Sequence, residues 1–167
     1  DLTDFQSSLI QTAFFGGYFL AALPAGWLMR RVGYKRGILT GLMICATGTL
    51  LFLPAAATRE YGFFLLALFV MACGQCFLEV AANPYVTVLG PPESAARRLN
   101  TAQAFNSVGA LITPILGATF ILSGVEYSQA QLAAMGPEAV ELYRITESQA
   151  VRGPYLVITA IFLVVAF

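Results

Sequence analysis

One acidic residue, Glu79, lies within a long apolar stretch of the chain. From Tyr61 to Pro92 no other residue is charged. In a membrane a carboxylate at this place costs about 2.5–3.5 kcal/mol to insert, and such residues usually serve a function. Desolvation disfavours the charged form, so Glu79 is predicted to take up and release a proton. Two alternatives stay open: a permanently protonated Glu79 that bonds a neighbouring helix, or one wetted at the cytoplasmic interface.

Amide side chains accompany Glu79 at helical spacing. Gln75 and Asn83 lie four residues before and after it, so on a helix all three share one face. Further along, Gln103 and Asn106 are three residues apart and share a face of the next helix. Amides donate and accept hydrogen bonds, which suits an uncharged substrate with many hydroxyl groups. Alternatively, Gln103 and Asn106 hold neighbouring membrane helices together.

The cysteines are expected to be packing residues. Cys73 and Cys76 form a C-x-x-C pair, but they lie in an apolar stretch, where a thiolate is disfavoured. A zinc site would lack ligands, because Cys45 is the one other cysteine and the chain has no histidine. The lack of histidine also excludes Ser-His and Cys-His catalysis. We therefore predict no enzyme, metal or cofactor, with an intramembrane redox or purely structural protein as the less favoured alternative.

The aromatic residues of the first third of the chain are expected to face lipid or the membrane interface. One of them could instead stack on a sugar ring. They are Tyr18, Phe19, Trp27 and Tyr34.

The composition is that of a membrane protein. Of the 167 residues, 58% are hydrophobic and 11% are charged, and the mean hydropathy is +0.75. Soluble domains carry about 25% charged residues, so this chain has too little polar surface for a water-soluble globule. Nine basic residues balance nine acidic ones, so no basic surface for nucleic acid is expected.

Long uncharged stretches predict an all-α membrane fold. About 20 apolar residues cross the hydrocarbon core as a helix, and the continuous apolar runs differ from the alternating strands of a membrane barrel. We predict about five membrane-spanning helices and an outer loop at 124–152 with a short surface helix near Pro137. The expected spans are 5–29, 37–58, 61–88, 99–123 and 153–167.

The loops alternate in charge and predict an orientation. Lys and Arg accumulate in cytoplasmic loops. The loops at 30–36 and 90–98 are basic, and the loop at 124–152 is net acidic. We expect the first two on the cytoplasmic side and the third outside. Because the chain begins without Met and ends in an apolar run, it is expected to be a fragment.

Four segments resemble the major facilitator superfamily. Residues 26–36, GWLMRRVGYKR, resemble its loop signature between the second and third helices. Residues 78–91, LEVAANPYVTVLGP, closely resemble the fourth helix of the L-fucose–proton symporter and glucose/galactose transporter family. Residues 98–107 are similar to the start of the fifth helix in that family, and residues 5–26 to its second helix. The resemblance therefore covers essentially the whole chain.

The resemblance implies helices two to six of a twelve-helix transporter built from two pseudo-symmetric halves. The first helix and the C-terminal half would then lie outside this chain. The implied activity is proton-coupled symport of a neutral monosaccharide, of the fucose, glucose or galactose type, by alternating access across a bacterial inner membrane. The loop at 124–152 would be periplasmic. A sodium-coupled carrier, with the ion bound by an ionised Glu79, stays an alternative.

The resemblance also assigns roles to single residues. Glu79 matches the proton-binding glutamate of the family, and Gln103 and Asn106 match its sugar-contacting amides; their spacing adds Asn83 and Gln75 as candidate sugar contacts. The loop signature departs from the superfamily pattern where Arg30 replaces an Asp and where Tyr34 replaces a basic residue. The residues expected in a cytoplasmic gate loop are Gly26, Arg31, Gly33, Lys35 and Arg36.

Overall fold

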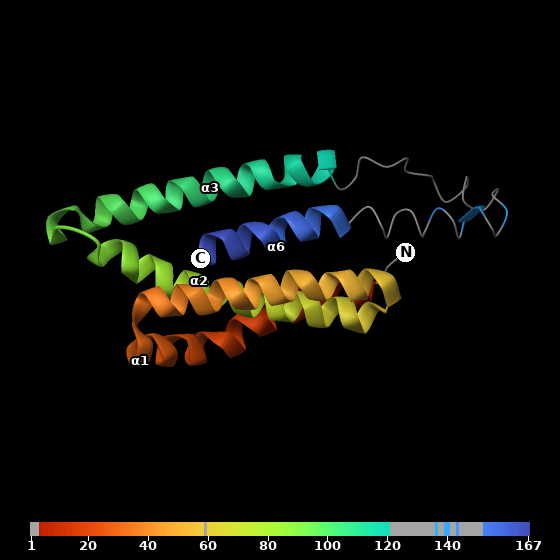
Figure 1. Ribbon diagram of the computed structural model, residues 1–167, viewed down its shortest axis with the longest axis horizontal. Helices are drawn as coiled ribbons and strands as arrows, with labels where there is room; N and C mark the ends of the chain where they lie inside the picture. Colours follow the sequence, from red (N-terminus) through yellow and green to blue (C-terminus); the bar gives the residue numbers. More distant parts are fainter. Residues whose placement is uncertain (1–3, 59, 121–135, 137–138, 141–142, 144–151) are drawn as a thin grey trace.

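All regular structure in the described part of the chain is helical, as predicted. This computed structural model describes residues 4–58, 60–120, 136, 139–140, 143 and 152–167. Successive long helices run back and forth along the long axis of the molecule (Figure 1). Most of the expected outer loop, including Pro137 and the start of its surface helix, lies outside the described residues. The elements are α1 (Asp4–Thr58), α2 (Tyr61–Val88), the 3-10 helix η1 (Pro92–Ser94), α3 (Ala95–Phe120) and α6 (Arg152–Ala166).

Helix α1 consists of two arms that fold back on one another at Gly33. This residue has φ 81° and ψ 167°, a backbone conformation that glycine adopts readily and other residues rarely. The arms therefore cover residues 4–32 and 34–58, and the reversal is visible in Figure 1. The charge pattern predicts a loop over 30–36, but the backbone there is helical except at Gly33. Arg and Lys are good helix formers, so the basic stretch continues both arms instead of separating them.

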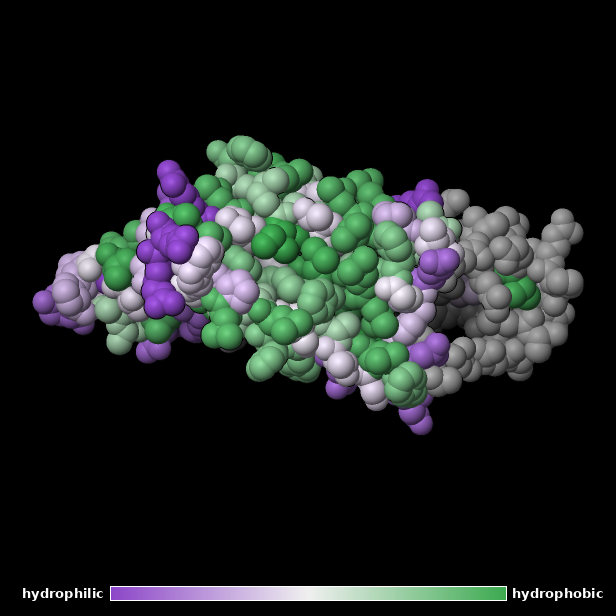
Figure 2. Space-filling view, turned by 90° about the horizontal axis from the view of Figure 1, so that it is seen from below, coloured by the Kyte–Doolittle hydropathy of each residue, from purple (hydrophilic) through white to green (hydrophobic). Residues whose placement is uncertain are grey.

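The length and surface of the helices fit an apolar environment. Among the described residues, α1 and α2 are long and apolar enough to cross a membrane, and α6 is a shorter apolar helix. At 1.5 Å per residue, the arm 34–58 is about 37 Å long and α2 is about 42 Å long, against a hydrocarbon core of roughly 30 Å. Figure 2 shows a broad apolar belt across the middle of one face, with polar side chains gathered at both ends.

Both arms of α1 pack against α2 through small residues. A Cβ atom added at Gly74 would lie 2.6 Å from the backbone nitrogen of Cys45, and one added at Gly48 would lie 2.7 Å from the backbone of Met71. Gly41 is similarly close to the backbone and side chain of Leu78. Small residues allow membrane helices to approach closely. The contact between α1 and α2 therefore leaves almost no space between the two backbones.

Helix α6 packs against the second arm of α1 through one polar and one aromatic contact. The hydroxyls of Thr49 and Thr159 lie 2.7 Å apart and both residues are buried. The rings of Phe52 and Tyr155 stack with their centroids 4.5 Å apart. Each hydroxyl also lies within hydrogen-bond distance of a carbonyl of its own helix. Because a hydroxyl has a single hydrogen, one of the two donates to the other and the second donates to its own helix, so both buried hydroxyls are satisfied.

Candidate functional site

A hollow of about 360 Å³ opens between α2 and α3. It brings together four of the five residues that the sequence proposed for proton and sugar binding. Glu79 and Asn83 come from α2, and Gln103 and Asn106 come from α3. The remaining wall is apolar and consists of Leu78, Ala82, Val86 and Ala102.

A hydrogen bond joins the two walls of this hollow. The Nε2 atom of Gln103 donates to the Oδ1 atom of Asn83 over 3.0 Å. An amide has two N–H donors and a carbonyl oxygen with two lone pairs. The pair therefore still offers the amino group of Asn83 and the carbonyl oxygen of Gln103 to a ligand. The two amides can donate to one hydroxyl and accept from another at the same time.

Helical geometry explains why α2 presents its polar groups together. Glu79 and Asn83 are one turn apart, so they project from the same face. Pro84 follows directly and cannot donate the helical hydrogen bond to the carbonyl of Val80. Glu79 is nine residues from Val88 at the end of α2, which is about 14 Å along the helix axis. With α2 centred in the roughly 30 Å core, that position falls inside the apolar belt.

Gln75, the fifth predicted residue, is exposed one turn before Glu79 and does not line the hollow. Helices α2 and α3 meet near the turn that joins them and diverge away from it (Figure 1). The wall contributed by α3 begins at Ala102 and extends to Asn106. Gln75 therefore shares the helical face of Glu79 but lies where α3 has moved away from α2.

Tyr18, on the first arm of α1, is a site residue that sequence reasoning missed. Its backbone carbonyl accepts from Cys76 Sγ, three residues before Glu79 on α2, and its side chain lies close enough to Glu79 for the two to interact electrostatically. Its place in an apolar stretch predicts a lipid or interface aromatic instead. No local signal could have linked the two residues, because they are far apart in the sequence and meet only when α1 packs on α2.

The cysteine thiols tie the first arm of α1 to α2. Cys73 Sγ donates to the carbonyl of Gly17 at 3.5 Å, and Cys76 Sγ donates to the carbonyl of Tyr18 at 3.4 Å. Cys45 is also a free thiol and is buried. In the described part of the chain, no group of three metal-binding side chains lies together. The contacts of the thiols are those of packing residues.

The predicted gate residues lie before, at and after Gly33, where α1 reverses. We call this reversal the elbow of α1. The guanidinium carbon of Arg31 lies 4.1 Å from the centre of the Trp27 ring, a cation–π distance. The rings of Tyr34 and Tyr85 have centroids 6.3 Å apart, so the residue after Gly33 contacts the end of α2. A role for this elbow in gating stays a prediction. The remaining predicted gate residues on the elbow are Gly26, Lys35 and Arg36.

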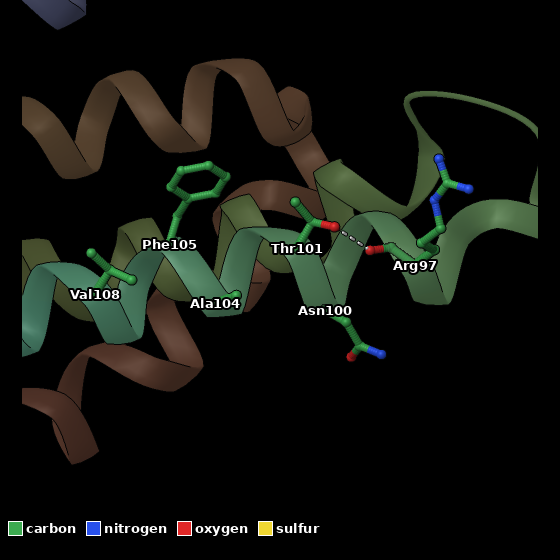
Figure 3. A pocket seen from close by; sticks show the side chains of 6 residues that line it. All are labelled: Arg97, Asn100, Thr101, Ala104, Phe105 and Val108. Atoms are coloured by element: carbon green, nitrogen blue, oxygen red, sulfur yellow. Dashed lines mark hydrogen bonds between the residues drawn. The ribbon is translucent and has the colours of Figure 1, made fainter.

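A larger hollow, of about 640 Å³, lies along α3 on its own (Figure 3). Its polar groups do not converge: the hydroxyl of Thr101 is bonded to the carbonyl of Arg97 at 2.9 Å, and Asn100 points to the opposite side of the helix. Ligand sites combine apolar walls with a few convergent polar groups. The smaller hollow between α2 and α3 meets that description and is the better candidate.

Comparison with protein families places the whole chain in one of them. The model of the Major Facilitator Superfamily matches residues 1–167. The chain is 50% identical over 166 residues to the L-fucose-proton symporter of Escherichia coli (strain K12), which covers 99% of this chain and 38% of that protein. It is 50% identical over 161 residues to a glucose/galactose transporter of Brucella abortus biovar 1 (strain 9-941), covering 96% of this chain and 36% of that protein. The chain thus spans less than two-fifths of the length of these relatives.

A solved structure has the same arrangement of helices. The crystal structure of a Major Facilitator Superfamily transporter, FucP, in the outward conformation matches with a TM-score of 0.88 and 50% identity. The match covers 99% of this chain and 40% of that chain.

Proposed function

Because this chain belongs to the Major Facilitator Superfamily and has its fold, we propose that the protein carries a neutral monosaccharide and a proton together across a bacterial inner membrane. Relatives that are 50% identical bear the names L-fucose-proton symporter and glucose/galactose transporter, which supports a sugar of the fucose, glucose or galactose type. The observation that carries the proposal is the hydrogen-bonded pair Asn83–Gln103 beside Glu79 in one hollow.

The sugar side of the proposal rests on the chemistry of the amides. A monosaccharide presents hydroxyl groups that each donate and accept, and it carries no charge. Asn83 and Gln103 offer both a donor and an acceptor around their mutual bond, and Asn106 adds a further amide one turn along α3. The apolar wall of the hollow gives the carbon face of a sugar ring a surface to pack on. Gln75, which lies outside this hollow, would act only in another state of the transporter.

The proton side rests on Glu79. A carboxylate within a membrane span is costly to keep charged. Among the residues that the structure describes, no lysine or arginine lines the hollow, whereas protonation makes Glu79 neutral. We infer that the protonated form binds sugar from outside and that the loaded carrier then exposes both to the cytoplasm. This order removes the cost of moving a charge through the membrane.

The chain would supply only one part of the transporter. We propose that it comprises helices two to six of twelve, completed by a first helix and a C-terminal half, with sugar bound between two halves that rock against one another. Cations gather at the end of the molecule that holds the α1 elbow and the α2–α3 turn, which supports a cytoplasmic location for the loops 30–36 and 90–98. The described cations at that end are Arg30, Arg31, Lys35, Arg36, Arg97 and Arg98.

The deciding experiment replaces Glu79 by Gln in the full-length protein, reconstituted in liposomes. Glu79→Gln is expected to abolish sugar-driven proton uptake and to leave exchange of labelled for unlabelled sugar intact, because Gln stands in for the protonated acid. Glu93→Gln is the matched control, since Glu93 is an exposed carboxylate on η1 outside the hollow. Proton movement that persists in Glu79→Gln would remove Glu79 from the coupling step.

The same liposomes separate a proton from a sodium coupling ion. Uptake of L-fucose, D-glucose and D-galactose is measured with a pH gradient in sodium-free buffer, and again with a sodium gradient at equal pH. The proposal expects uptake of at least one sugar under the first condition. Uptake under the second condition alone would favour the sodium-coupled carrier, with Glu79 ionised and bound to the ion.

A further inference from the structure

Arg98 forms a clamp between the end of α2 and the start of α3. Its Nε atom donates to the carbonyl of Val86 at 3.1 Å, and its Nη2 atom donates to the carbonyl of Thr87 at 2.7 Å. Its Nη1 atom donates to the carbonyl of Pro91 at 3.1 Å and to the hydroxyl of Ser94 at 2.6 Å. All three guanidinium nitrogens are therefore engaged, two with the last turn of α2 and one with the connecting segment.

The chemistry of this contact requires an arginine. The last four carbonyls of a helix have no partner within it, and the helix dipole places partial negative charge there. A guanidinium presents its N–H groups as a rigid planar fork, so one side chain can reach carbonyls of two neighbouring residues at once. A lysine in the same place has one nitrogen and cannot span Val86, Thr87 and Pro91 together.

The clamp lies close to the proposed sugar site along both α2 and α3. Arg98 precedes Gln103 by five residues on α3, which is about 7.5 Å along the axis. Val86 and Thr87 follow Asn83 by about one turn on α2. Among the described residues, the side-chain hydrogen bonds between α2 and α3 are those of Arg98 and the Asn83–Gln103 bond. The separation of the two amides therefore depends on how the clamp joins the helices.

We propose that Arg98 is a positioning residue for the sugar site. By fixing the cytoplasmic ends of α2 and α3 to one another, it sets the distance between Asn83 and Gln103 and hence the opening that receives a sugar. Arg98 does not touch the sugar. This inference rests on the sugar-binding role proposed above for the two amides.

Two neighbouring residues provide matched tests of the clamp. Arg97 is exposed, and as the neighbour of Arg98 on a helix it projects about 100° away from it around the axis, so Arg97→Ala removes the same charge from the same turn without touching the clamp. Gly90 faces the guanidinium, and a Cβ atom added there would lie 2.9 Å from Nη1 of Arg98. Gly90→Ala therefore displaces the fork while retaining its charge.

The first experiment measures sugar uptake by the full-length protein in liposomes, using whichever of L-fucose, D-glucose and D-galactose the wild type carries. Arg98→Ala is expected to raise the apparent KM about fivefold, with the maximal rate per inserted protein within about twofold, as for the loss of a positioning hydrogen bond. Arg98→Lys and Gly90→Ala should lie between Arg98→Ala and the wild type, and Arg97→Ala should match the wild type. In an Asn83→Ala background, Arg98→Ala should have no further effect on KM, because coupled residues are not additive.

The second experiment tests how close residues 83 and 103 lie, without a transport assay. The double replacement Asn83→Cys/Gln103→Cys is oxidised in membrane vesicles, and the 83–103 cross-link is quantified by mass spectrometry of the digested protein. Adding Arg98→Ala should slow cross-linking severalfold, whereas adding Arg97→Ala should leave it unchanged. Equal cross-linking rates in the two would overturn the proposal. So would an Arg98→Ala effect on KM that persists in full in the Asn83→Ala background.

The two proposals can fail separately. A wild-type protein that carries none of the three sugars contradicts the proposed function, while the cross-linking rates still decide whether Arg98 sets the distance. A wild-type protein that carries sugar, with a KM that Arg98→Ala does not change, contradicts the positioning role alone.

Discussion

The two faces of α2 make contacts of opposite kinds. Toward α1 the helices meet through glycines and thiols, and an added methyl group at Gly74 would collide with the backbone of Cys45. Toward α3 the helices meet over a short stretch, and the contact is polar: the Asn83–Gln103 bond and the fork of Arg98. One contact is dense and has no room to change. The other is held by a few bonds around an open hollow.

The two contacts are suited to different roles: the α1–α2 contact to supporting the fold, and the α2–α3 contact to binding a ligand. Interiors that are close-packed lose stability when any atom is added or removed. Polar contacts can exchange one partner for another, so an amide that bonds a neighbouring helix can bond a sugar instead. The dense face fixes Glu79 and Tyr18 relative to one another, and the open face leaves the amides accessible to a ligand.

The largest expected effect comes from overfilling the dense contact. Gly74→Ala should destabilise the full-length protein by about 1–3 kcal/mol, because an extra carbon forces the α1 and α2 backbones apart. The measurement is thermal unfolding of the purified protein in detergent. Gly62→Ala is the control on the same helix, since nothing lies within 4 Å of its added Cβ atom. Equal melting temperatures for the two variants would contradict the contrast between the faces.

Removing an amide from the open contact should have a smaller effect on stability and a clear effect on binding. Gln103→Ala should raise the apparent KM for sugar about tenfold, because the amide's contact to the ligand and its bond to Asn83 are lost together. Its melting temperature should stay near that of the wild type. Asn100→Ala removes the same group from a position on α3 that does not line the hollow between α2 and α3 and should leave KM unchanged; a similar rise there would mean that the amides act only on the fold.

The Thr49–Thr159 contact is an intermediate case, a polar bond inside a packed interface. Thr49→Val should destabilise the protein by about 0.6–1.7 kcal/mol, the range for hydrogen bonds between membrane helices. A double replacement with Thr159→Val should cost less than the sum of the two single changes. Thr47→Val is the control, because the hydroxyl of Thr47 bonds Met43 of its own helix. Additive effects would show that the two hydroxyls do not depend on each other.

The smallest expected effect is that of the tyrosine beside Glu79. Tyr18→Phe removes a polar group close to Glu79 and keeps the ring in its place against α2. Sugar-driven proton uptake should fall about threefold, the size expected for the loss of one modest polar interaction, while sugar exchange stays unchanged. Tyr85→Phe is the control, because the ring of Tyr85 contacts Tyr34 and does not line the hollow. An equal fall in uptake and exchange would make Tyr18 a packing residue.

Helical periodicity accounts for what could be predicted from the sequence. The spacing of Glu79 and Asn83, and of Gln103 and Asn106, placed each pair on one face, and the structure brings the two faces together. Helix α2 (Tyr61–Val88) lies within the stretch from Tyr61 to Pro92 in which Glu79 is the one charged residue. These properties are local, because they depend on residues within a few turns of one another.

What could not be predicted depends on how helices pack. Tyr18 reaches Glu79 only through the α1–α2 contact, and Gln75 is left outside the hollow because α3 diverges from α2. The basic stretch 30–36 was expected to be a loop, since charge marks the end of a membrane span. Charge does not break a helix, however, and the reversal is made by Gly33 alone.

That reversal leaves the connection between the arms of α1 without any spare length. An ordinary loop absorbs an inserted or deleted residue by changing its path. Here one extra residue on either side of Gly33 would extend a helix, turning one arm by about 100° and advancing it by about 1.5 Å. Gly41 and Gly48 would then rotate away from α2, and larger side chains would take their places. The number of residues between the two arms is therefore fixed as strictly as their identity.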